Sequence, residues 1–87
     1  MYFVYMIRNQ HGDLYTGISE NPQQRLTYHN ENRGARFTKR ESLFEIVFLE
    51  EHPTLSSART REIQIKKWRR DKKEMLIMRY AQDVSTN

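Results

Sequence analysis

The stretch YFVYMIRNQHGDLYTGI, residues 2–18, has the pattern of two strands joined by a tight turn. Its first part, residues 2–7, is an aromatic and β-branched run that is typical of a buried strand. Residues 10–13 supply turn-forming side chains, and Gly12 is suited to a positive φ angle there. Residues 14–18 predict the second strand. The chain is therefore expected to open with a β-hairpin.

A helix and a third strand are predicted after the hairpin. Asn21 is positioned to cap a helix, and Pro22 suits its first position. We expect this helix to end near Glu31, in a loop over residues 32–35 that contains a glycine. Residues 44–49 form another apolar run, which predicts a strand.

Two further helices are predicted in the second half of the chain. Thr54 or Ser56 can cap a helix that runs to about Arg69, and Asp71 can cap a shorter one through Tyr80. The expected order is β-β-α-β-α-α. This order predicts an α+β domain with a small three-stranded antiparallel sheet flanked by helices.

The 87 residues leave room for one domain. We assign residues 1–80 to it and residues 81–87, which are polar and without periodicity, to a flexible tail. The chain has no cysteine, so neither disulfides nor thiolate metal sites are expected. The apolar run over residues 2–7 is too short for a signal peptide or a membrane span, which predicts a soluble, cytoplasmic protein without membrane association.

The charge balance is basic, with fifteen Lys and Arg against eleven Asp and Glu and a net charge of +4. Four basic residues and no acid lie between Arg33 and Arg40, and eight basic residues against two acids lie between Arg59 and Lys73. Positive charge attracts phosphate backbones regardless of sequence, so nucleic acid is the expected partner. The alternative is that these residues only form solvated helix faces.

Two pairs of side chains are candidates for chemistry. Tyr5 and Tyr15 lie on the two hairpin strands and are expected to come close to facing each other across the turn. Read alone, they fit ordinary strand packing better than a catalytic role. Arg25 and His29 stand four residues apart on one face of the first helix. Arginine can hold a phosphate oxygen and histidine can move a proton near neutral pH, although a solvated polar face is the simpler reading.

Glu62 lies on the apolar stripe of the second helix. The stripe consists of Leu55, Ala58, Ile65 and Trp68. A carboxylate on such a face is costly unless it is paired or binds a metal. An ion pair with Lys66 or Arg59 is therefore one explanation. A Mg²⁺ site completed by water and phosphate is the other.

Taken together and in order, these residues resemble the GIY-YIG endonuclease superfamily, and most closely its small stand-alone bacterial branch. The resemblance covers about residues 2–77. The sequence departs from the superfamily pattern in its first motif, which reads Val-Tyr-Met, and at Thr16 in its second motif. The matching motifs are Tyr2-Phe3-Val4-Tyr5-Met6, Leu14-Tyr15-Thr16-Gly17, Arg25 to His29, Gly34-Ala35-Arg36-Phe37-Thr38 and Glu62-Ile63-Gln64-Ile65-Lys66.

The resemblance implies hydrolysis of phosphodiesters with one divalent metal, Mg²⁺ or Mn²⁺, held by Glu62. A tyrosine would act on the attacking water, with first contact assigned to Tyr5 and support to Tyr15. Because a free phenol has a pKa near 10, a tyrosine that acts as a base needs nearby cations to lower that value. Arg25 would supply part of this charge and bind the phosphate oxygens.

The other members of the expected site are also implied by the resemblance. His29 would relay the tyrosine's proton, and Gly17 would let the backbone approach the phosphate without a side chain in the way. We expect structure-directed cleavage of DNA with little base-sequence specificity, as in repair or recombination, while RNA stays an open substrate. The expected contacts to the phosphate backbone are Arg33, Arg36, Lys39 and Arg40.

Two other functions fit parts of the sequence. One is a nucleic-acid-binding module of the same fold with weak or no activity. The other is a protein-interaction domain whose basic helices meet an acidic partner. Retention of Tyr5, Arg25 and Glu62 in register favours the enzyme over both.

Overall fold

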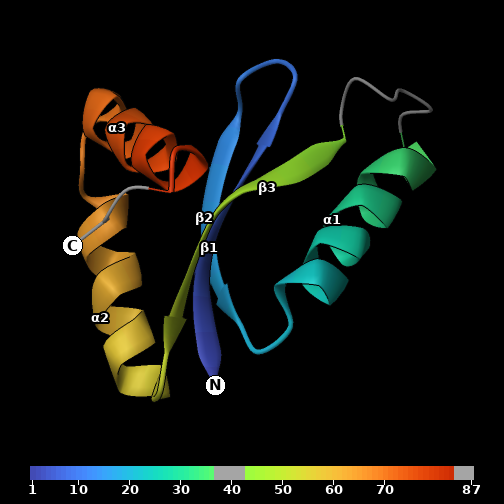
Figure 1. Ribbon diagram of the computed structural model, residues 1–87. Coiled ribbons are helices and arrows are strands. Elements are labelled where there is room, and N and C mark those ends of the chain that lie inside the picture. The colour runs from blue at the N-terminus through green and yellow to red at the C-terminus, as the bar shows by residue number, and fades with distance from the viewer. Residues whose placement is uncertain (37–42, 84–87) are drawn as a thin grey trace.

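The computed structural model describes residues 1–36 and 43–83, with side chains described throughout except at residues 32–36. The three strands form one antiparallel sheet in the order β2-β1-β3. Helix α1 covers one face of this sheet, and α2 and α3 cover the other (Figure 1). The predicted α+β class and element order are confirmed. The elements are β1 (Tyr2–Asn9), β2 (Leu14–Ser19), α1 (Pro22–Arg36), β3 (Phe44–His52), α2 (Leu55–Lys66) and α3 (Arg70–Ala81).

The hairpin turn is organised by a buried asparagine. The side-chain oxygen of Asn9 accepts hydrogen bonds from the backbone N–H groups of His11 and Asp13, at 3.0 and 2.9 Å. Gly12 has a φ of 88°, as its place in the turn predicts. This turn sets the register in which Tyr5 lies opposite Gly17.

Alternate residues of β1 face two separate apolar cores, because successive side chains of a strand point to opposite faces. Full burial of each large apolar side chain stabilises the fold by roughly 1.5–3 kcal/mol. The core under α2 and α3 contains Val4, Met6, Phe48, Ala58, Ile65, Leu76 and Ile77, and the core under α1 contains Tyr5, Ile7 and Phe44.

Helix α1 and strand β3 run furthest beyond their predicted ends. Helix α1 continues past Glu31 to Arg36, so the predicted loop over residues 32–35 is wrong. A glycine inside a helix costs only about 1 kcal/mol, and Asn30 holds this part of α1 against the start of β3. Its side chain donates to the carbonyl of Phe44 and accepts from its N–H, at 3.1 and 2.7 Å. Strand β3 extends to His52 because it pairs with the whole of β1.

The second half of the chain corrects three further expectations. Thr54 caps α2 as predicted, accepting from the N–H of Ser57 at 3.1 Å. The helix nevertheless ends at Lys66, and Leu55, which was expected in the core, is 41% exposed. Asp71 does not cap α3, because Arg69 occupies the N-cap position and Asp71 lies in the first turn.

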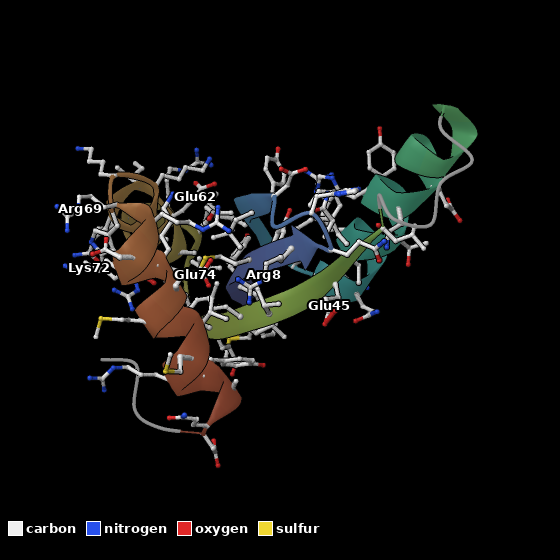
Figure 2. The ribbon with its side chains drawn as sticks, turned by 90° about the horizontal axis from the view of Figure 1, so that it is seen from above. Arg8, Glu45, Glu62, Arg69, Lys72 and Glu74 are labelled. Atoms are coloured by element: carbon white, nitrogen blue, oxygen red, sulfur yellow. The ribbon has the colours of Figure 1, made fainter. Side chains whose placement is uncertain are left out.

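An ion-pair network fastens α3 to the hairpin. Glu74 binds Arg8 of β1 at 2.6 Å and Arg70 at 2.7 Å, and Figure 2 shows Arg8 and Glu74 side by side. Arg70 also donates to the carbonyl of Gly12, at 2.6 Å. Hydrogen bonds from Arg8 and then Arg70 lower the pKa of the Glu74 carboxyl. Across the two described ranges, no helix is long and apolar enough to cross a membrane.

Candidate active site

Five residues that the sequence singled out line one cleft, which has a volume of about 530 Å³. They are Tyr5, Tyr15, Arg25, His29 and Glu62. They come from β1, β2, α1 and α2, so the cleft is built beside the edge strand β2 by helices from both faces of the sheet. The fold therefore brings the five together, while the chemical role of each residue stays a prediction. The lining consists of Tyr5, Tyr15, Thr16, Gly17, Ile18, Arg25, Tyr28, His29, Arg59, Glu62 and Lys66.

The two strand tyrosines are diagonal neighbours rather than a facing pair. Tyr5 pairs with Gly17 and Tyr15 with Ile7, so the two phenols are offset by one same-face position. Tyr5 lies across Gly17. A Cβ atom at Gly17 would come within 2.6 Å of the Tyr5 hydroxyl and 2.7 Å of its Cζ. Gly17 therefore provides the space that the Tyr5 ring occupies.

Tyr5 is buried, at 2% exposure, whereas Tyr15 is 50% exposed. Burial raises the pKa of Tyr5 above its ordinary value of 10, because the charged phenolate is poorly solvated there. A hydrogen bond from Arg25 and its positive charge act to lower this pKa, as expected, but burial outweighs them. Arg25 by itself therefore does not bring the pKa of Tyr5 below its ordinary value.

This raised pKa predicts an alkaline loss of stability that depends on Tyr5. In the unfolded chain the phenol ionises near pH 10. The folded state resists ionisation, so its contribution is complete below pH 10 and is lost as the pH rises through the folded value. Between about pH 9 and about pH 11, the urea midpoint should fall further in the wild type than in Tyr5→Phe. The Tyr15→Phe control retains Tyr5 and should follow the wild type, while equal losses in all three proteins would contradict the burial.

Tyr15 and His29 form an aromatic pair at the open side of the cleft. Their ring centroids are 5.0 Å apart with an interplanar angle of 78°, and His29 lies 6.4 Å from the Phe44 ring on its other side. Edge-to-face contacts of this kind fix the orientation of both rings. The accessible phenol and the imidazole are therefore held next to each other.

Glu62 is half-buried, with 15% of its side chain exposed, and it lies on α2 (Figure 2). Its carboxylate oxygen Oε2 is 3.1 Å from the Lys66 ammonium. The ion pair expected from the helical spacing is therefore present. Glu62 also acts electrostatically on Tyr5 across the cleft, where its negative charge favours the neutral phenol. The first explanation for Glu62, an ion pair, is therefore observed, and the second, a Mg²⁺ site, stays a prediction.

Five lining residues had not been assigned to the site: Thr16, Ile18, Tyr28, Arg59 and Lys66. Arg59 and Lys66 share the helix face of Glu62, at three residues before it and four residues after it, and this spacing was the signal available in the sequence. Tyr28 precedes His29 on α1 and lines the same cleft. With Arg25, the cleft holds three cationic side chains against one carboxylate, which favours an anionic ligand.

The expected contacts to the phosphate backbone are only partly placed. Arg33 and Arg36 belong to the last turns of α1 rather than to a loop, so they lie on the helix that carries Arg25 and His29. Lys39 and Arg40 lie outside the described residues. Their predicted contacts to a backbone stay predictions.

The donor set of the cleft is compatible with a single hard cation. Within the described part of the chain, no three Asp, Glu or His side chains cluster as a complete metal cage. Mg²⁺ rarely uses such a cage, because it keeps several waters and binds through one or two carboxylates and the substrate's phosphates. The Lys66 contact involves one carboxylate oxygen of Glu62, and a carboxylate has two. Glu62 therefore fits as the protein ligand of such an ion.

Comparison with known proteins agrees with this arrangement. A family model described as the GIY-YIG catalytic domain matches residues 1–75. A UPF0213 protein of Staphylococcus epidermidis is 37% identical over 76 residues, which cover 87% of this chain and 93% of that protein. UPF0213 proteins of Staphylococcus aureus are 38% identical over the same length. The solution structure of a UPF0213 protein from Bacillus halodurans superposes with a TM-score of 0.58 and 29% identity, covering 90% of this chain and 84% of the other.

The matched region contains every residue that lines the cleft and the whole three-stranded sheet. The relatives are small proteins that consist of little beyond this domain. The chain therefore belongs to the GIY-YIG family of endonuclease domains.

Proposed function

We propose that this protein is a divalent-metal-dependent endonuclease that hydrolyses DNA phosphodiesters. The observation that carries the proposal is the convergence of Tyr5, Tyr15, Arg25, His29 and Glu62 on one cleft with an excess of positive charge. An excess of cations would attract the phosphate, and a single half-buried carboxylate would hold Mg²⁺ or Mn²⁺. A bound cation would polarise a phosphate oxygen and stabilise the charge on the leaving oxygen.

The difference in exposure between Tyr5 and Tyr15 supports different roles for the two tyrosines. Tyr15 is accessible and lies against His29, so we assign the contact with the attacking water to Tyr15, in place of the Tyr5 contact expected from the resemblance, and the acceptance of the proton to His29. Tyr5 is buried and lines the cleft together with Arg25, so we assign to it the positioning of that guanidinium. Arg25 would then bind the non-bridging phosphate oxygens as their charge increases.

The proposed substrate is DNA recognised by shape rather than by base sequence. Arg33, Arg36, Lys39 and Arg40 would contact the phosphate backbone beside the cleft. Phosphate contacts position a protein on nucleic acid but carry no sequence information. Such recognition is compatible with the proposed structure-directed role in repair or recombination.

A nicking assay tests this proposal. Purified protein should convert supercoiled plasmid to the open-circular form with Mg²⁺ or Mn²⁺ and should lose this activity completely when EDTA is added. Because contaminating nucleases are also inhibited by EDTA, Arg25→Ala purified in the same way is the matched control and should be inactive. A folded wild-type protein that binds the plasmid but leaves it supercoiled would instead identify a binding module of the same fold.

A further inference from the structure

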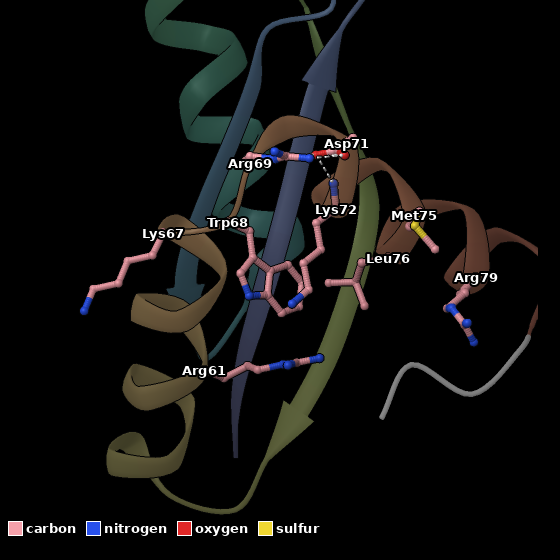
Figure 3. Close-up of a pocket in the computed structure, with 9 residues that line it drawn as sticks. All are labelled: Arg61, Lys67, Trp68, Arg69, Asp71, Lys72, Met75, Leu76 and Arg79. Atoms are coloured by element: carbon pink, nitrogen blue, oxygen red, sulfur yellow. Dashed lines mark hydrogen bonds and ion pairs between the residues drawn. The ribbon is translucent and has the colours of Figure 1, made fainter.

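A second concave surface lies at the junction of α2 and α3, and we call it the Trp68 groove (Figure 3). Its volume is about 780 Å³, which is within the range of roughly 300–1,000 Å³ for pockets that hold small ligands. It shares no lining residue with the cleft that contains Glu62. It is lined by Arg61, Lys67, Trp68, Arg69, Asp71, Lys72, Met75, Leu76 and Arg79.

Two parts of the groove differ in chemistry. The floor is apolar, because Trp68 packs against the core and Leu76 belongs to it. Lys67, Arg69 and Lys72 are exposed at the rim. Arg61 also lines the groove, but it is held by Glu50 at 3.0 Å and belongs to the framework of the fold. An apolar floor below a cationic rim suits a ligand that has both flat apolar rings and phosphates.

The indole ring of Trp68 can be reached from the groove. The Lys72 ammonium lies 4.4 Å from the ring centroid and the Arg61 guanidinium carbon 5.4 Å from it. A cation in that position requires a ring face that is not covered by the core. A nucleobase can stack on the same face in place of the flexible lysine, which then follows the phosphate.

We propose that the Trp68 groove binds a single-stranded segment of DNA, with a base on the Trp68 ring and phosphates at Arg69 and Lys72. A duplex keeps its bases stacked in pairs, so it could offer only phosphates to the rim and nothing to the floor. The groove therefore discriminates in favour of a single strand, which a duplex-binding surface would not do.

The groove is next to the candidate active site along the chain. Lys66 lines the cleft and its neighbour Lys67 lines the groove, so the two surfaces meet at the C-terminal end of α2. A strand that leaves the cleft past this end would enter the groove. This arrangement suits a substrate that has a single-stranded DNA arm beside a duplex. The assignment of this substrate class rests on the proposed nuclease function.

Asp71 occupies the place of an anion in the empty groove. Its carboxylate accepts two hydrogen bonds from Arg69, at 3.0 and 3.3 Å, and one from the N–H of Lys72 at 3.0 Å. These are the donors that a phosphate at the rim would use. Asp71→Asn removes the negative charge and weakens the competition for Arg69, so it should tighten the binding of a single strand.

Trp68 is the only tryptophan of the chain, so fluorescence excited at wavelengths that the tyrosines do not absorb reports on this groove alone. We would titrate the full chain with a single-stranded oligothymidylate and with a blunt duplex of equal length, in EDTA so that no strand is cut. The single strand should quench Trp68 fluorescence and the duplex should not. Absence of quenching by the single strand, or equal quenching by both, would overturn the proposal.

Two neighbouring lysines give a matched pair of variants. Lys72→Gln keeps an alkyl stem over the indole but removes the charge, and it should reduce the log–log salt dependence of single-strand binding by about 0.7. Lys73→Gln makes the same change one residue along α3, outside the groove lining, and should leave the slope unchanged. Equal slopes for the two variants would place the bound strand elsewhere.

Failure of this proposal is distinct from failure of the nuclease assignment. Quenching requires neither metal nor cleavage. A protein that nicks plasmid but shows no quenching would refute the groove alone. A protein whose fluorescence is quenched but which never nicks would refute the nuclease assignment and leave the groove in place.

Discussion

Glu62→Gln is expected to reduce plasmid nicking by at least about a hundredfold while DNA binding persists or becomes tighter. The substitution keeps the shape of the side chain and removes the charge that would hold the cation. Such an ion supplies several kcal/mol of transition-state stabilisation, and each 1.36 kcal/mol changes the rate by a factor of ten. Loss of a negative charge near the phosphates favours binding. The measurements are nicking, binding and thermal melting on one preparation.

Lys66→Gln is the matched control, because it breaks the same ion pair from the other side. An ion pair of this kind is worth about 0.2–1 kcal/mol when one partner is exposed, and Lys66 is about half-exposed. If Glu62 serves only this pair, both variants should be slightly destabilised and both should nick normally. If Glu62 holds the cation, melting should change little in either variant, and nicking should fall far more in Glu62→Gln. Full activity of a well-folded Glu62→Gln protein would end the metal-ligand proposal.

The direction in which Glu62 points could be predicted from the sequence, because helical spacing depends only on residues that are close along the chain. Its distances of seven, four and three residues from Leu55, Ala58 and Ile65 put it on the inward stripe. Ala58 and Ile65 are fully buried, as this stripe predicts. Leu55 is exposed because α2 begins there, beyond the part of the helix that lies over the sheet. The stripe therefore predicted which way Glu62 points, but not where the packing contact begins.

Other features depend on particular side-chain hydrogen bonds and could not be predicted. Helix α1 continues through a glycine because Asn30 is bonded to Phe44, fourteen residues away. The offset between Tyr5 and Tyr15 follows from the hydrogen-bonded turn that Asn9 organises. Neither the Asn30 bonds nor the Asn9 bonds can be read from the secondary-structure propensities of single residues.

The basic run from Arg59 to Lys73 is the clearest case of information that only the fold supplies. In sequence it is a single block of charge, read as one phosphate-binding surface. In the structure α2 divides it, with Arg59 and Lys66 in the cleft and Lys67 and Lys72 in the Trp68 groove. The division follows from the 3.6-residue turn of α2 and from the end of that helix at Lys66.

Gly17→Ala is expected to destabilise the fold and abolish cleavage together. The added methyl would lie 2.6 Å from the Tyr5 hydroxyl and 2.7 Å from its Cζ, well inside van der Waals contact. The Tyr5 ring is rigid and buried, so relief requires movement of the ring or of β2. Overpacking of this kind costs about 1–3 kcal/mol, and each kcal/mol lowers the melting temperature of a domain this size by roughly 4–8 °C. A displaced ring also shifts the Arg25 guanidinium that lines the same cleft.

A second substitution identifies the cause. In a Tyr5→Leu background the ring atoms that meet the new methyl are gone, so adding Gly17→Ala should cost much less stability than it does in the wild type. This non-additivity is the expected signature of two groups in direct contact. If Gly17 instead serves only to let a phosphate approach the backbone, Gly17→Ala should melt like the wild type and lose binding and cleavage alone. Thermal melting of the two single variants and the double variant, with nicking measured on each, therefore decides whether Gly17 acts through Tyr5 or through the substrate.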